Sequence, residues 1–165
     1  MVFRFRRTFQ AKGPDRFVVN LGAEEREVVK AVCEDLGSVL EDGRDNPAVR
    51  RLFPTAHATD AEVDRQYQDL VHSDLLSSRR AILAAVAASA DEEELDREGL
   101  EQWMVGLNSV RLVLGTVLDV SEDGYPDLDR DDPQLPIWAV YEFLGSVVDA
   151  AVTALAATLP DLPAG

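Results

Sequence analysis

The sequence has little of the chemistry that enzymes and metal proteins use. Among 165 residues there are one cysteine, Cys33, and two histidines, His57 and His72. A single cysteine excludes an internal disulfide and a multi-cysteine metal site, and it fits a reducing compartment. The histidines lack the H-x-x-x-H and H-E-x-x-H spacings of familiar zinc sites, so we expect no metal and no cofactor.

Nucleotide-binding and nucleophile motifs are also missing. The sequence contains no G-x-x-x-x-G-K-[ST], G-x-G-x-x-G or G-x-S-x-G segment, which removes the common phosphate-binding loops and the nucleophile elbow. The acidic run that starts at Asp127 does not match an EF-hand loop, because the positions that need Gly and Glu hold Asp132 and Trp138. We therefore expect a binding protein that is not an enzyme.

Long hydrophobic runs are absent as well. No window of eighteen apolar residues occurs, and Arg4, Arg6 and Arg7 interrupt the start of the chain, where a signal peptide needs a continuous apolar segment. The length and the 46% of hydrophobic residues are typical of one domain with its own core. We expect a cytoplasmic protein with a single domain over residues 1–159 and a proline-rich tail over 160–165.

Negative charge dominates the chain except at its start. The formal net charge is −15, yet residues 1–16 hold five basic residues against Asp15 alone, so this segment carries +4 and the remainder −19. A negative field opposes the approach of duplex DNA. We therefore do not expect the chain to bind DNA alone, and any effect on DNA would come through a protein partner.

The residue pattern predicts a mainly helical fold that begins with a two-stranded β-hairpin. Partial alternation over residues 1–9, turn residues at 12–15 and a β-branched, aromatic segment at 16–21 predict the hairpin over residues 1–21. Apolar residues then recur at three- and four-residue steps over residues 23–41 and 59–89. After a loop at 91–94 the same spacing recurs along the stripe 100–118 and over residues 135–158. These segments predict a bundle of about four long helices over 23–159, with a short helix that Asn46 and Pro47 begin.

The fourth helical segment is almost free of charge between Ile137 and Leu159, apart from Glu142 and Asp149. A helix that is apolar all round is usually buried, so we favour the central core as its position. The alternative is that it forms the face of a homodimer.

Two charges fall inside the predicted apolar stripes. Asp74 lies four residues after Leu70, and Arg111 lies four residues after Leu107. A buried charge needs a partner, so we expect an interhelical ion pair, shared with Arg79 or Asn108, that fixes the helix register. A small polar pocket that binds a ligand is the alternative.

Cys33 lies beside Val32 near the apolar stripe of the first helical segment. A lone helical cysteine in such a place is usually an inert small hydrophobe. A redox role would need exposure and a nearby cation such as Lys30, and it could give only a mixed or intermolecular disulfide.

Three segments carry a family resemblance. They are RLFPTA at residues 51–56, DLLSSR at 74–79 and WMVGLNSVRLVLG at 103–115. In this order they resemble an actinobacterial family, formerly a domain of unknown function and known through AosR-like oxidative-stress transcriptional regulators. The likeness runs from the N-terminal hairpin through the last helix.

The resemblance implies a regulator that binds an extracytoplasmic-function sigma factor or RNA polymerase and adjusts oxidative-stress genes. Some relatives are proposed to sense oxidant through a cysteine pair near the N-terminus, but residues 1–20 contain no cysteine here. Genes of the family often lie near those for a protease adaptor and for sulfur-carrier cysteine synthesis. One alternative is therefore a helical adaptor that dimerises through the fourth helix and serves proteolysis or sulfur assimilation. A bundle with a small-ligand pocket around Asp74 and Arg111 is the other alternative, and it follows from the placement of these two charges.

The hairpin arginines are the residues that we expect to bind the partner. Arg4, Arg6, Arg7 and Arg16 would give the hairpin one basic face, suited either to the acidic surface of a protein partner or to the DNA backbone close to a bound polymerase. The alternative is that these arginines pair with acids of the chain's own helices.

Overall fold

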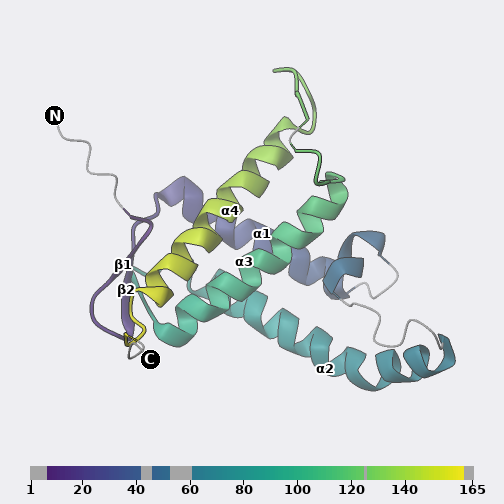
Figure 1. Cartoon of the computed structure of the whole chain (residues 1–165), viewed down its shortest axis with the longest axis horizontal. Coiled ribbons are helices and arrows are strands. Elements are labelled where there is room, and N and C mark those ends of the chain that lie inside the picture. The colour runs from purple at the N-terminus through teal and green to yellow at the C-terminus, as the bar shows by residue number, and fades with distance from the viewer. Residues whose placement is uncertain (1–6, 42–45, 53–60, 125, 162–165) are drawn as a thin grey trace.

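The computed structural model describes residues 7–41, 46–52, 61–124 and 126–161, without the side chains of residues 50, 51, 61, 64 and 67–73. The elements in chain order are β1 (Phe9–Ala11), β2 (Arg16–Val19), α1 (Ala23–Glu41), the 3-10 helix η1 (Pro47–Leu52), α2 (Ala61–Ala88), β3 (Glu94–Asp96), α3 (Arg97–Val117) and α4 (Leu135–Ala156). The described chain is mainly helical, with a small antiparallel sheet at one end (Figure 1).

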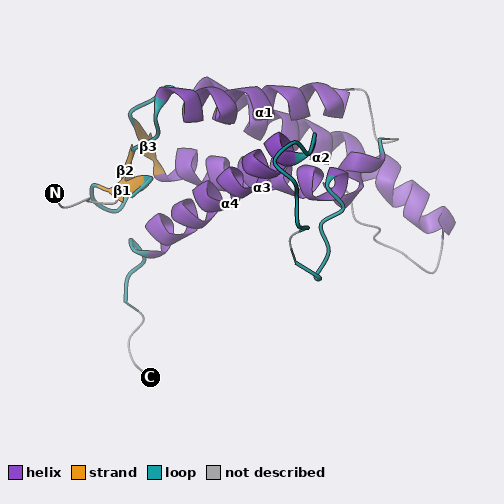
Figure 2. Cartoon of the chain, turned by 90° about the horizontal axis from the view of Figure 1, so that it is seen from above, coloured by secondary structure: helices purple, strands orange, loops and turns teal. Residues whose placement is uncertain are grey.

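The helices pack against one another in chain order. α1 lies against α2, α2 against α3 and α3 against α4, and η1 also packs on α3. In the view from above, α1 lies on one side of α3 and α4, and the strands lie at the end where α1 begins (Figure 2). α3 therefore lies at the centre of the described core.

The sheet has the order β1-β2-β3, and its apolar side chains face the helices. Phe9 lies opposite Val19, and Phe17 lies opposite Leu95. All four of these side chains are buried, and the ring of Phe9 meets that of Trp103 on α3 edge-on, with centroids 5.9 Å apart. A two-stranded hairpin is marginal in water, so contact with α3 stabilises it.

The predicted strands need a correction. Residues 1–6 of the predicted first strand lie outside the described residues, and the described strand β1 covers 9–11, where Phe9 pairs with Val19 and packs on Trp103. A third strand, β3, includes Glu94, which we expected in a loop. It forms because Leu95 pairs with Phe17 and adds a buried side chain to the core.

The start of the short helix η1 agrees with the predicted residues Asn46 and Pro47. Asn46 accepts a hydrogen bond from the Ala48 N–H at 2.9 Å, immediately before Pro47. α1 spans the predicted residues 23–41, and Glu25 in its first turn accepts from the Gly22 N–H at 2.7 Å. These bonds satisfy backbone donors that a helix leaves free at its N-terminus.

α4 is long and apolar enough to cross a membrane by length and composition, a test that core helices also pass. Leu144, Val147 and Ala151 on one face are at most 1% exposed, and this face packs mainly against α3. That burial agrees with the core position favoured for the fourth helix.

Candidate functional site

The described basic residues of the hairpin differ in what they contact. Arg16 on β2 donates from Nε and Nη2 to the carboxylate of Glu94 on β3, at 3.1 and 2.5 Å. The hydrogen bond with Glu94, followed by its charge, raises the pKa of Arg16 above the ordinary value. Arg16 therefore has an acidic partner within the sheet.

Arg97, the first residue of α3, connects the hairpin turn with the end of α4. Its guanidinium donates to the Asp15 carboxylate at 3.3 Å and to the Pro14 carbonyl at 3.0 Å. It also donates to the Thr158 hydroxyl at 2.5 Å. The acid of the hairpin turn is therefore already paired with a cation of the helical part.

Arg7 and Lys12 are the other described cations of the hairpin. Both are exposed, and neither side chain forms an ion pair with any residue that the structure describes. Arg4 and Arg6 lie outside the described residues. Arg7 is therefore one of the four arginines predicted to bind a partner, and among the described residues no acid occupies its charge.

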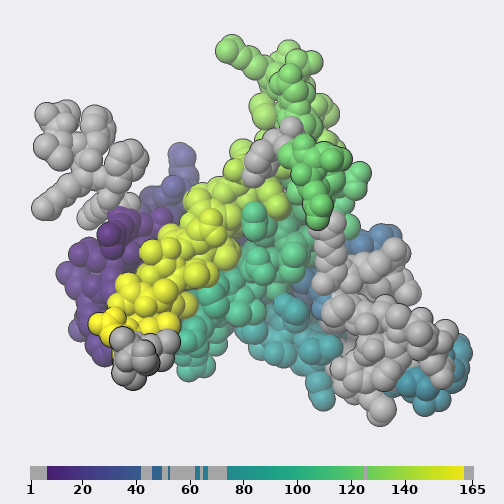
Figure 3. All heavy atoms as spheres, viewed as in Figure 1, coloured from purple at the N-terminus to yellow at the C-terminus, as the bar shows by residue number. Residues whose placement is uncertain are grey.

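A groove lies between β1 and the C-terminal half of α4. Its volume is about 590 Å³, and its walls are residues 7–11 on one side and Ala150, Thr153, Ala154 and Ala157 on the other. Atoms of the hairpin and of the α4 end lie side by side in the space-filling view (Figure 3). The small side chains of α4 leave this space beside the strand.

The residues predicted to form a polar cluster do not form one site. Arg79 on α2 donates to the hydroxyl of Ser109 on α3 at 2.8 Å. Asp74 and Asn108 are exposed. Within the described part of the chain, no ion pair joins Asp74 with Arg111.

The prediction that Asp74 lies in the apolar stripe is wrong because of the phase of α2. The buried side chains there include Leu83 and Val86, and Leu76 is partly buried, whereas Leu75 is 41% exposed. Nine residues separate Asp74 from Leu83, which at about 100° per residue puts them on opposite faces. Asp74 therefore points away from α3.

Arg111 is partly buried, as predicted, but its partner is an aromatic ring. Its guanidinium carbon lies 4.8 Å from the ring centroid of Tyr141 on α4. Its Nε is buried and has no hydrogen-bond acceptor among the described residues. A cation over an aromatic face keeps a favourable electrostatic contact without an acid, so Arg111 joins α3 to α4.

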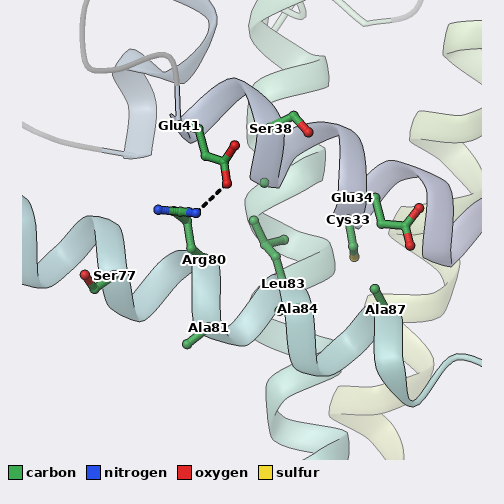
Figure 4. A pocket seen from close by; sticks show the side chains of 11 residues that line it. Cys33, Glu34, Ser38, Glu41, Ser77, Arg80, Ala81, Leu83, Ala84 and Ala87 are labelled. Atoms are coloured by element: carbon green, nitrogen blue, oxygen red, sulfur yellow. Dashed lines mark hydrogen bonds and ion pairs between the residues drawn. The ribbon is translucent and has the colours of Figure 1, made fainter.

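Cys33 lies at the floor of a second cavity, of about 540 Å³, between α1 and α2. The thiol is 1% exposed, and Cys33 and Ala87 point toward one another (Figure 4). At one end of the cavity Arg80 forms an ion pair with Glu41. Burial, with a smaller contribution from the charge of Glu34, raises the pKa of the Cys33 thiol to about 12.

Residues that hold the sheet in place gave little signal in the sequence. Arg26 on α1 donates to four backbone carbonyls at 2.7–3.1 Å, those of Val19, Leu21, Ala90 and Glu92. Only its position in the first turns of a helix, next to the predicted strand, could have suggested this role. The groove was missed as well, since alanines do not mark a site in a sequence.

Metal-binding geometry does not occur in the described residues, where no three His, Cys, Asp or Glu side chains are grouped to hold an ion. His57 lies outside the described residues, as does the side chain of His72.

Comparison with known proteins identifies a family. The family model described as a domain of unknown function (DUF2017) matches residues 5–155. Neither the curated proteins nor the solved structures contain a match. Because the family model covers most of the chain, the protein belongs to this family.

Proposed function

We propose that this DUF2017 protein is a cytoplasmic regulator without enzymatic activity, and that it binds an extracytoplasmic-function sigma factor or RNA polymerase. The class of partner comes from the resemblance to oxidative-stress regulators. The observation that supports the binding surface is the pair Arg7 and Lys12, two exposed cations without an acidic partner among the described residues of a chain with net charge −15. Such a patch favours an acidic protein surface and speeds the encounter with it.

In this proposal the four helices act as a bundle that holds the hairpin rigid. Arg26 on α1 bonds to the carbonyls of Val19 and Leu21 at the end of the hairpin, and Arg97 on α3 bonds to Asp15 and Pro14 in its turn. Arg26 also bonds to the carbonyls of Ala90 and Glu92 between α2 and β3, so it ties that connection to the hairpin. A surface that is ordered before binding loses less conformational entropy in the complex. The hairpin is therefore suited to recognition.

The oxidant signal, in this proposal, does not enter through Cys33. A thiol that is 1% exposed and has a pKa of about 12 holds its proton at neutral pH and is shielded from solutes. The regulator would respond through its amount or through its partner.

An affinity capture tests the proposal. The immobilised chain is incubated with a native lysate of cells that encode it, with and without peroxide, and the retained proteins are identified by mass spectrometry. We expect enrichment of a sigma factor or of polymerase subunits, and loss of that enrichment in Arg7→Glu. Arg130→Glu is the matched control, because Arg130 is exposed in the acidic loop and its reversal changes the net charge equally. Absence of every transcription component would refute the proposal.

A helical adaptor is the second candidate, and exposed apolar residues of α3 support it. Val105 and Leu112 are 38% and 37% exposed and lie seven residues apart, so they share one face. On α4, Val152 is 48% exposed, whereas Val148 packs against the core. Sedimentation of wild type and Val152→Glu separates the cases: a dimer that the substitution dissociates would support the adaptor, and a monomer in both would remove the dimer.

A further inference from the structure

The geometry points to the free edge of β1 as the place where the partner binds, with an extended acidic segment of that partner adding to the sheet as a fourth strand. The inference rests on the proposed function, since it specifies how the hairpin recognises the protein partner. Three independent features of the described residues support it: the backbone groups at the edge, the groove beside it and the charge around it.

The backbone of β1 leaves hydrogen-bonding groups free on its outer side. In the hairpin, Lys12 N–H donates to the Arg16 carbonyl at 2.7 Å and Asn20 N–H donates to the Thr8 carbonyl at 2.8 Å. Bonded and non-bonded pairs alternate in an antiparallel ladder, so Phe9 and Ala11 direct their N–H and C=O groups away from β2. No described residue bonds to these four groups. They form the kind of edge to which a strand adds.

The groove gives an added strand a place to lie. Residues 7–11 line one wall, and the opposite wall is made of Ala150, Thr153 and Ala154 on α4 and of Ala157 directly after it. Alternate side chains of an incoming strand would point toward this wall and away from it. Because the α4 wall is made of small side chains, the groove has room for partner side chains of moderate size, such as valine. The backbone of the partner strand would then reach the backbone of Phe9 and Ala11.

The charge beside the edge selects an acidic occupant. Arg7 and Lys12 lie at the two ends of β1, both exposed and both without an acidic partner among the described side chains. Asp15 is bonded to Arg97 and does not offset them. A second copy of this chain would bring another Arg7 and another Lys12 to the same short edge, and like charges gathered there oppose the pairing. An acidic partner segment has the complementary charge.

The edge is held in one conformation. Phe9 is 3% exposed and packs on Trp103, and the Asn20 side-chain amide donates to the Arg7 carbonyl at 2.8 Å. A partner strand would therefore meet an ordered template.

Backbone amides of the full-length, ¹⁵N-labelled chain report on this mode of binding directly. The probe is a capped hexapeptide of alternating glutamate and valine, and the control probe carries lysine in place of glutamate. We expect the amide signals of Phe9 and Ala11 to shift with the acidic peptide and their hydrogen exchange to slow at least about tenfold. The lysine peptide should bind at least about tenfold more weakly. If Phe9 and Ala11 show neither a shift nor protection at about 1 mM acidic peptide, the inference is wrong.

Two neighbouring substitutions at the end of α4 distinguish the groove from the rest of the surface. Ala157 lines the groove, whereas Ala156 is exposed and does not. Ala157→Trp should weaken peptide binding at least about tenfold, and Ala156→Trp should leave it within about twofold. Equal effects of Ala157→Trp and Ala156→Trp would contradict strand addition. Amide shifts at Phe9 and Ala11 that depend on protein concentration in the absence of peptide would contradict it as well, because they would show that a second copy of the chain binds the edge.

The captured transcription component distinguishes the two proposals. If it binds wild type and Ala157→Trp equally, strand addition at β1 is wrong and the proposed function stands. If no transcription component is captured while the acidic peptide binds the edge, the proposed function is wrong and the peptide site stands.

Discussion

Cys33 should react with thiol reagents much more slowly than an exposed cysteine of the same helix. The rise of its pKa from the ordinary 9.0 to about 12 lowers the thiolate fraction at neutral pH about 1,000-fold. A more basic thiolate is a better nucleophile, which recovers roughly 15- to 30-fold and leaves a rate about 30- to 60-fold lower. Exclusion of the reagent from a side chain that is 1% exposed lowers it further.

The assay is the rate of modification by iodoacetamide at neutral pH, in wild type and in the double variant Cys33→Ala, Ser38→Cys. Ser38 is exposed on α1 and lines the same cavity, so its replacement supplies a matched accessible thiol. Wild type should react at least about 30-fold more slowly, and both proteins should react at similar rates in denaturant. Native rates within about threefold of each other would refute the reasoning and restore direct oxidation of Cys33 as a signal.

Three other measurements test the structural account. Arg26→Met removes four hydrogen bonds to carbonyls and should lower the free energy of unfolding, measured in urea, by about 2–4 kcal/mol. The control Lys30→Met removes the same charge one turn later and should change that free energy by less than about 0.5 kcal/mol. Equal losses in the two variants would contradict the role of Arg26. Gly106→Ala would place a Cβ 3.0 Å from Val86 Cγ2 and should destabilise by about 1–3 kcal/mol, but Gly37→Ala meets open space and should stabilise by up to about 1 kcal/mol. The pKa of Cys33 is raised in the folded chain, so the thiol's contribution to the free energy of unfolding is complete below pH 9.0 and is lost as the pH rises through about 12. The difference in the free energy of unfolding between wild type and Cys33→Ala should therefore shrink over that range.

The helices could be predicted because their signals are local. A continuous three- and four-residue apolar period and capping residues such as Asn46 and Glu25 mark their ends within a few positions. β3 carries no such signal, since three residues with one apolar side chain, Leu95, form a strand only where Phe17 is already in place. Short strands of this kind depend on distant contacts, which a single sequence does not contain.

The site was predictable only in its charge. A basic N-terminal segment is evident from composition, but the pairing of Arg16 with Glu94 joins residues 78 positions apart and depends on the sheet register. The apolar stripe of α2 could have included either Leu75 or Leu76, which are adjacent. In the structure the stripe that includes Leu76 packs against the core, and Leu75 is exposed. The groove beside β1 is defined by small residues and free backbone groups, neither of which a residue pattern identifies.

Binding in a purified system tests the central claim most directly. We would titrate three proteins: wild type, Arg7→Glu and the control Arg130→Glu. Each is titrated against purified RNA polymerase core and against extracytoplasmic-function sigma factors of the same cells. The affinity is measured by interferometry at low and at physiological salt. The account predicts saturable binding to one of these components, weakened at least about tenfold by Arg7→Glu and within about twofold of wild type in Arg130→Glu. No saturable binding to any of them, or equal losses in the two variants, would contradict a transcription regulator that acts through its hairpin.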